Sequence, residues 1–179
     1  MTVPSKAKAG IISARSNVSA ADSLAVDVQI ACGDPGVPLQ SDVQDWIQLA
    51  IRQSGRAPGG HVELAVRIVN AEEIRVLNMQ YRQQDKVTNV LSFPAGAVAG
   101  LPETEGIELG DIVICASVVR AEAASQGIAL EDHWAHVLIH GALHLLGYDH
   151  EQESAAAEME GLEAQILARR GISNPYQSR

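Results

Sequence analysis

The residues with the clearest chemical potential in this sequence form the stretch HGALHLLGYDH, from His140 to His150. His140 and His144 stand four residues apart in an apolar run, so on a helix both lie on one face, one turn apart. Gly147 predicts the end of that helix, because glycine readily adopts the left-handed conformation common at helix C-termini. The chain can then turn and return His150 towards the first two imidazoles. The spacing therefore predicts a metal site with His140, His144 and His150 as ligands.

Three histidine ligands leave one position of a tetrahedral zinc ion open to water, as in catalytic zinc sites. A single histidine is more often a core or capping residue, but three at these spacings, with a glycine between the second and the third, favour a metal site. We expect one Zn²⁺ per chain. Such an ion brings the pKa of its bound water to about 7 and polarises carbonyl or phosphoryl oxygens. The expected chemistry is therefore hydrolysis.

Two further histidines precede this motif. His136 shares the helix face of His140 and His144, but a helix rises about 1.5 Å per residue, which places His136 and His144 about 12 Å apart along the axis. One ion with bonds of about 2.1 Å cannot readily hold both. We therefore expect His136 to support a ligand or to face the substrate, and His133 to lie near the helix start.

The spacing of the three histidines equals that of metzincin proteases, so a zinc peptidase is one alternative. Those enzymes carry a glutamate directly after the first histidine, where it acts as general base. Here that position is Gly141. Cleavage of a phosphodiester depends more on charge stabilisation and positioning, which a metal and an arginine supply. The missing carboxylate therefore favours a phosphodiester over a peptide substrate.

A second informative stretch is YRQQDKVTNVLSFP, which ends at Pro94. It places Arg82 and Lys86 near the end of a predicted helix and then continues into a short apolar segment, residues 90–93. The negative end of a helix dipole favours a cation by itself. From the residues alone, Arg82 is therefore more simply a solvated side chain than a functional one.

Composition and charge limit the class of protein. The 179 residues suit one domain with an ample core, and no apolar run approaches the length of a membrane span. Cys32 and Cys115 lie in apolar stretches and are expected to be buried free thiols in a reducing compartment. The net charge is −9, and the whole acidic excess falls in residues 101–179. An acidic chain lacks the basic footprint usual for nucleic-acid binders, so a polyanionic substrate would need local positive charge from the first half and the metal.

Hydrophobic periodicity predicts about four strands and five helices. Capping signatures mark two helix starts, Ser41 with Gln44 and Asn70 with Glu73. Residues 1–22 are expected to be a disordered extension and residues 23–179 one domain. Residues 95–109 are predicted to be a loop, and the glutamates of the last helix are expected on a solvated face. The predicted strands cover residues 24–30, 62–68, 90–93 and 112–114, and the predicted helices residues 41–54, 71–81, 117–126, 131–146 and 151–170.

Three segments in this order resemble the YbeY family of bacterial single-strand-specific metallo-endoribonucleases: LNMQYRQQDKVTNVLSFP, LGDIVIC and HGALHLLGYDH. The resemblance covers about Leu24 to Tyr176. It implies an α+β zincin-like fold with a small mixed sheet, a zinc ion and a cytoplasmic location. It also implies single-stranded RNA as substrate, and work in 16S rRNA 3′-end maturation and ribosome quality control on the ribosome or its small subunit.

Residue by residue, the resemblance places the zinc ligands at His140, His144 and His150 and the functional arginine at Arg82. The prediction for Arg82 is thereby reversed. Val87 stands where the family usually has proline. This change is expected to make the turn less rigid, but it removes no chemical group needed for activity. The RNA groove is expected to be lined by Lys86, Thr88, Asn89, Ser92 and His136.

Two questions stay open at this level. The general base is not assigned: Asp149 and Glu151 are near in sequence, but Asp149 is equally suited to orient a ligand imidazole. The second alternative function is a non-catalytic ribosome-assembly factor, in which the zinc mainly holds the C-terminal turn. Removing the metal would unfold such a protein, whereas a catalytic site would lose activity first.

Overall fold

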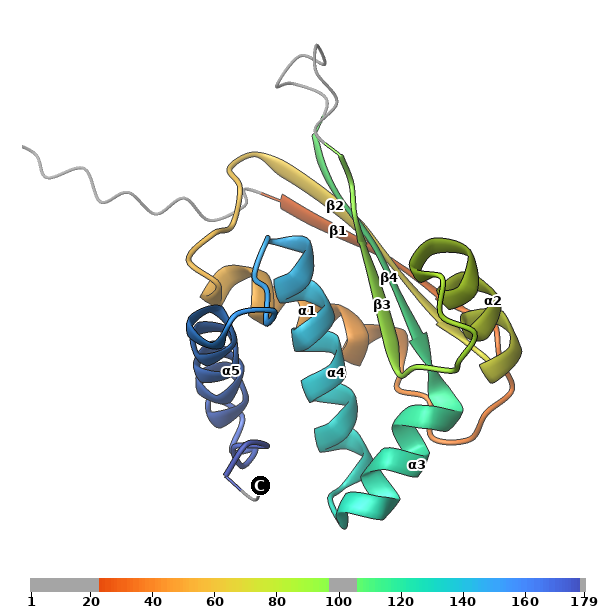
Figure 1. The fold of residues 1–179 in the computed structure, drawn as a ribbon. Coiled ribbons are helices and arrows are strands. Elements are labelled where there is room, and N and C mark those ends of the chain that lie inside the picture. Colours follow the sequence, from red (N-terminus) through yellow and green to blue (C-terminus); the bar gives the residue numbers. More distant parts are fainter. Residues whose placement is uncertain (1–22, 97–105, 178–179) are drawn as a thin grey trace, which may run out of the picture.

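The computed structural model describes residues 23–96 and 106–177 of the chain (Figure 1). The predicted extension, residues 1–22, and much of the predicted loop at 95–109 lie outside these residues. The described elements, in chain order, are β1 Ser23–Ile30, α1 Gln40–Gln53, β2 His61–Val69, α2 Ala71–Arg82, β3 Val90–Pro94, β4 Ile107–Cys115, α3 Ala116–Gln126, α4 Leu130–Leu145 and α5 Glu153–Ala168.

The strands in the described part of the chain form a four-stranded mixed sheet with the order β1-β2-β4-β3. The strands β1, β2 and β4 are parallel, and β3 pairs antiparallel with β4 at the edge. Helices connect the parallel strands because such a crossover needs a long connection. The prediction of an α+β fold with about four strands and five helices is confirmed.

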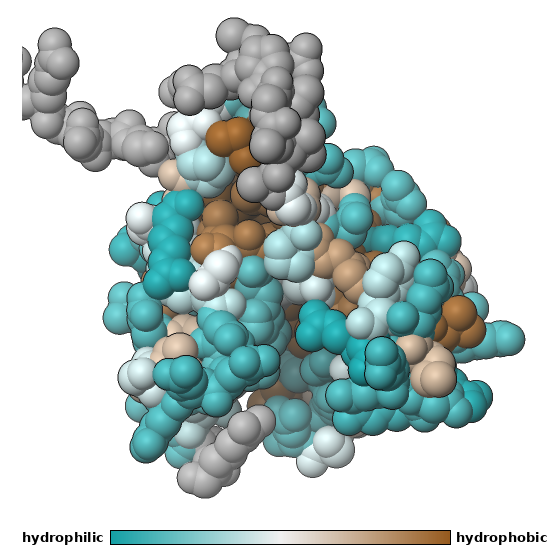
Figure 2. All heavy atoms as spheres, turned by 45° about the horizontal axis from the view of Figure 1, so that its top comes forward, coloured by the Kyte–Doolittle hydropathy of each residue, from teal (hydrophilic) through white to brown (hydrophobic). Residues whose placement is uncertain are grey.

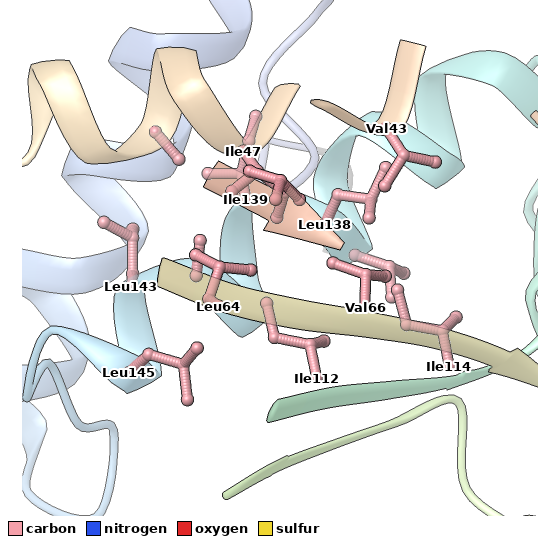
Figure 3. Packing of buried hydrophobic residues seen from close by; sticks show 14 of the residues in the cluster. Val43, Ile47, Leu64, Val66, Ile112, Ile114, Leu138, Ile139, Leu143 and Leu145 are labelled. Atoms are coloured by element: carbon pink, nitrogen blue, oxygen red, sulfur yellow. The ribbon is translucent and has the colours of Figure 1, made fainter. Parts of the chain in front are cut away.

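One face of the sheet carries the main core. Helices α1 and α4 pack on this face, and α5 packs against α4 (Figure 1). The predicted alternation in β2 is observed, since Val62, Leu64, Val66 and Ile68 are all buried. In Figure 3, Leu64 and Val66 of β2 face side chains from α1 and α4, among them Ile47. The histidine helix α4 is thus held against the sheet by its apolar side.

The opposite face carries a smaller cluster around Ile74 of α2, with Val69, Leu91 and Val113 from the sheet. Helix α2 begins as predicted, because the Asn70 side chain accepts a hydrogen bond of 2.9 Å from the backbone N–H of Glu73. This cap satisfies one of the free N–H groups at the helix start. The cap and the cluster together fix the helix whose last residue is Arg82.

Three expectations were wrong in detail. Helix α1 is capped by Leu39 without a side-chain bond, so the Ser41 capping box does not form. Gln44 instead donates to the carbonyl oxygen of Val26 and ties α1 to β1. Strand β4 begins at Ile107, within the predicted loop, because its pairing with β2 extends that far. Cys32 is only half-buried, whereas Cys115 is buried as predicted, and both are free thiols.

The surface seen in Figure 2 is mostly hydrophilic, with hydrophobic residues gathered in hollows and isolated spots. No helix in the described ranges combines the length and the apolar character that crossing a bilayer requires.

Candidate metal centre

His140 and His144 project from one face of α4, and the turn after the helix brings His150 to them. The Nε2 atoms of His140 and His144 are 3.1 Å apart. The His150 ring lies 5.6 Å from the His140 ring and 5.0 Å from the His144 ring, measured between centroids. Each of the three residues offers a ligand atom, and these atoms lie within 4.8 Å of one another. The three predicted ligands therefore converge.

The turn that delivers His150 is built from local and long-range contacts. Gly147 has φ +80°, the left-handed conformation predicted for it. Tyr148 is buried, and its hydroxyl donates to the carbonyl oxygen of Ser54. The Asp149 carboxylate accepts hydrogen bonds from the backbone N–H groups of His150 and Glu151. Asp149 thus shapes the turn and makes no bond to a ligand imidazole.

The Nδ1 atoms of the two helix histidines, His140 and His144, each bond to an acceptor. His140 Nδ1 lies 2.8 Å from Glu163 Oε1, and His144 Nδ1 lies 3.0 Å from the carbonyl oxygen of Tyr148. Because both partners accept, each Nδ1 carries the proton and each Nε2 presents a lone pair. Two lone pairs 3.1 Å apart repel unless a cation lies between them. Nitrogens that share a tetrahedral zinc at about 2.1 Å are about 3.4 Å apart, so this donor set fits a metal ion.

The protonation states suit the same interpretation. Burial and the nearby charges of His140 and His150 lower the pKa of His144 to about 4, so its imidazole is neutral near pH 7. Neutral imidazole is the form that binds metals. Burial alone raises the pKa of Glu163, but hydrogen bonds from His136, His140 and Tyr176 outweigh this effect and lower the pKa to about 2. Glu163 is therefore an anion behind the three-histidine cluster.

Glu163 is the residue that the sequence analysis missed. The glutamates of the last helix were expected on a solvated face, yet the Glu163 side chain is completely buried. A signal was present, because Met159, Glu163, Ile166 and Leu167 follow helical spacing and form the buried side of α5. The charge of the side chain concealed its place in that pattern.

His136 and His133 support the site from behind. His136 Nε2 lies 3.2 Å from Glu163 Oε2 and 3.0 Å from the Tyr176 hydroxyl. His133 is buried near the start of α4, as predicted, and its Nε2 lies 2.8 Å from Glu122. His136, His140 and Glu163 also bring ligand atoms within 4.8 Å. We favour the three-histidine set, because an ion beside the buried Glu163 would displace the proton that His140 donates to it.

A groove of about 480 Å³ opens in front of the three histidines. Predicted residues Arg82, Lys86, Thr88 and Ser92 line this groove together with His140, His144 and His150. The predicted Asn89 and His136 line a second hollow of about 330 Å³, which shares His140 and His150 with the first. All predicted site residues therefore border a space next to the histidine cluster.

The loop that carries the basic residues is fixed at several points. Arg82, the last residue of α2, is exposed, and its Nη2 donates to the carbonyl oxygen of Ser92 at 3.3 Å. Asn78 is buried and donates to the carbonyl oxygen of Lys86 at 2.8 Å. An ion pair between Arg75 and Asp85 joins α2 to the same loop. The two cations are thereby placed at the rim of the groove.

Two of the predicted groove residues already have protein partners. The Ser92 side chain is buried and its hydroxyl donates to the carbonyl oxygen of Gly141 at 3.2 Å, which ties β3 to α4. Asn89 donates to Glu122, the residue that also contacts His133. The side chains of Lys86 and Arg82 are more available to a substrate.

Gly141 explains why the glutamate of metzincins has no counterpart here. A Cβ at this position would lie 2.8 Å from Cγ2 of Ile112 and 3.5 Å from Ser92 Oγ. Helix α4 approaches the sheet so closely that a side chain at position 141 has no room. The general base of those peptidases is therefore excluded from this position by packing.

The mixed sheet, the converging imidazoles and the adjoining groove are features that suit a metal-dependent hydrolase. The chain belongs to the endoribonuclease YbeY family, whose model, described as "Endoribonuclease YbeY", matches residues 30–171. This membership confirms the resemblance seen in the sequence and makes the protein an enzyme of a family of RNA hydrolases.

Individual relatives in sequence match most of the chain. A protein named endoribonuclease YbeY from Colwellia psychrerythraea is 46% identical over 154 residues, covering 84% of this chain and 96% of the relative. One from Halorhodospira halophila is 53% identical over 142 residues, covering 79% and 90%. The solution structure of TM1509 from Thermotoga maritima is 26% identical with a TM-score of 0.49, covering 80% of this chain and 91% of that one.

Proposed function

We propose that this protein is a zinc-dependent endoribonuclease that cleaves single-stranded RNA. The observation that carries the proposal is the convergence of three imidazoles at a groove whose rim holds Arg82 and Lys86. Family membership supplies the RNA substrate class. The three-imidazole donor set is one that suits zinc among several transition metals.

The residues at the groove have separable roles in this proposal. His140, His144 and His150 would hold the ion, which when bound lowers the pKa of water and polarises a phosphoryl oxygen. Arg82 binds the phosphate and offsets the charge that develops on it during cleavage. Lys86 and Thr88 bind the backbone of the strand beside it. A groove that contacts backbone and unpaired bases suits a single strand better than a duplex.

Of the two candidates for the general base, we propose Glu151. Both acidic residues border the groove, but Asp149 already accepts two backbone hydrogen bonds in the turn. Glu151 is exposed and lies next to His150. Glu151→Gln is therefore expected to slow RNA cleavage without loss of bound zinc.

In the cell, we propose action in the cytoplasm on 16S rRNA, with the ribosome or its small subunit as partner. The proposed work is maturation of the rRNA 3′ end and ribosome quality control. The support is the family to which the chain belongs. The acidic excess of the chain also suits docking to basic ribosomal proteins.

The test is zinc analysis and RNA cleavage on the same purified samples. Wild type should contain about one zinc per chain and cleave an end-labelled single-stranded RNA, leaving a duplex of the same sequence intact. His144→Ala should lose both zinc and cleavage while remaining folded by circular dichroism. Zinc-free wild type, or undiminished cleavage by His144→Ala, would refute the proposal. A casein assay on the wild type covers the peptidase alternative, which Gly141 disfavours.

A further inference from the structure

The buried carboxylate of Glu163 lies directly behind the proposed metal site. It comes from α5, and its Oε1 accepts a hydrogen bond of 2.8 Å from Nδ1 of His140. No part of the Glu163 side chain is exposed to solvent. The carboxylate is therefore not free to bind a substrate, and it acts on the site through the residues that it contacts, of which His140 is the proposed metal ligand.

The second oxygen of the carboxylate is held as firmly as the first. Oε2 accepts a hydrogen bond from the Tyr176 hydroxyl and lies 3.2 Å from Nε2 of His136. Burial of a charge is costly unless hydrogen bonds compensate it, and here Oε1 has one donor and Oε2 has two. These contacts leave the carboxylate one orientation, in which Oε1 faces His140.

This contact determines which nitrogen of His140 is available to an ion. With the proton on Nδ1, the lone pair of Nε2 faces Nε2 of His144 at 3.1 Å. An anionic acceptor also makes the imidazole a more basic ligand than a neutral acceptor does. His144 has such a neutral acceptor, the Tyr148 carbonyl. The ring of His150 makes no hydrogen bond to the described residues.

We infer that Glu163 is a positioning residue that sets the tautomer, orientation and basicity of His140 as a metal ligand. The inference rests on the proposed function in that it assumes an ion at His140, His144 and His150. It assigns a role to a residue of α5 that lies outside the histidine motif. It also implies that His136 and Tyr176 affect the metal indirectly, because they hold the carboxylate of Glu163 in place.

The first test compares Glu163→Gln with Glu153→Gln, the same change at an exposed position in the first turn of α5. Zinc affinity is measured by competition with a chromophoric chelator, and the Co²⁺-loaded proteins are compared by absorption spectroscopy. Loss of an outer-shell hydrogen bond typically weakens metal binding about 10–100-fold. We expect that loss and an altered Co²⁺ spectrum for Glu163→Gln, and wild-type behaviour for Glu153→Gln.

A second measurement needs no variant, in case Glu163→Gln does not fold. Long-range ¹H–¹⁵N correlation spectra of the zinc-loaded wild type should show His140 with a slowly exchanging proton on Nδ1. A His140 proton on Nε2, or a folded Glu163→Gln with wild-type zinc affinity and Co²⁺ spectrum, would overturn the inference while the proposed function stood. A wild type that binds no zinc would overturn both.

Discussion

At the level of single residues, the three proposed metal ligands differ in burial and in the hydrogen bonds that hold their rings. His140 and His144 are half-buried, and the Nδ1 atom of each makes a hydrogen bond. His150 is exposed, and the turn after α4 places it. Arg82 is also exposed, and its hydrogen bond to the Ser92 carbonyl oxygen uses only one Nη of the guanidinium, so the other donors can bind a phosphate. A guanidinium presents five donors in a planar fork that matches the oxygens of a phosphate.

Replacement of Arg82 with Ala should therefore lower the rate of cleavage and leave zinc binding intact. Removing one donor that stabilises transition-state charge costs about 10²–10³-fold in kcat. Single-turnover cleavage of a labelled single-stranded RNA measures this effect. Arg52→Ala, the same change at an exposed position in the last turn of α1, is the control and should match wild type. Equal rates for the two variants would remove Arg82 from the mechanism.

At the level of elements, the site depends on how closely α4 approaches the sheet. Gly141 faces Ile112 of β4 and the Ser92 hydroxyl of β3, and that hydroxyl donates to the Gly141 carbonyl. Residues of β3 line the groove, and α4 carries two of the three proposed ligands. The spacing between these two elements therefore sets the width of the groove.

Gly141→Ala should destabilise the fold, because the new Cβ would lie 2.8 Å from Ile112. Overpacking of this kind costs about 1–3 kcal/mol. The free energy of unfolding in urea measures it. Gly161→Ala in α5 provides a matched control with opposite sign, since a Cβ there meets no atom within 4 Å. An alanine in place of glycine within a helix gains about 0.5–1 kcal/mol. A stabilised Gly141→Ala would contradict the packing described here.

At the level of the whole molecule, the core and the metal centre are largely separate. The main core consists of apolar side chains from α1, α4, α5 and the sheet. Full burial of one such side chain contributes about 1.5–3 kcal/mol. The fold therefore has a source of stability that does not involve the proposed ion.

Removal of zinc with a chelator should abolish RNA cleavage while the protein remains folded. Far-ultraviolet circular dichroism and a thermal melt before and after chelation measure the fold, and activity should return when zinc is added. Cooperative unfolding upon chelation would instead support the alternative of an assembly factor with structural zinc.

The net charge of the whole molecule predicts that RNA binds weakly and that its binding depends on salt. The protein has a net charge of −9, and the cations at the groove are Arg82 and Lys86 among the described lining residues. Each phosphate contact contributes about −0.7 to the slope of log K against log salt for a single strand. Lys86→Ala should make the slope shallower by about that amount, measured by fluorescence anisotropy with a chelator present to prevent cleavage. Arg52→Ala should keep the wild-type slope, and an unchanged slope for Lys86→Ala would place that lysine outside the RNA path.

Much of the fold followed from local patterns. The alternation in residues 62–68 gave strand β2, and Asn70 gave the start of α2. The predicted capping box at Ser41 was wrong because Gln44 bonds to Val26 of β1 instead. A contact between distant segments cannot be predicted from a local pattern. The first residues of β4 were wrongly predicted to be a loop for a similar reason, since pairing with β2 extends that strand.

By itself, the sequence determined that His140 and His144 share a helix face, that Gly147 ends the helix, and that His150 follows within reach, because helical periodicity and glycine conformation are local properties. Only the tertiary structure decided that Glu163 is buried behind His140 and that Arg82 borders the same groove. Those placements depend on the packing of α5 and α2 against elements far away in the chain. A charged side chain on a helix is normally solvated, and only a buried set of donors reverses that preference.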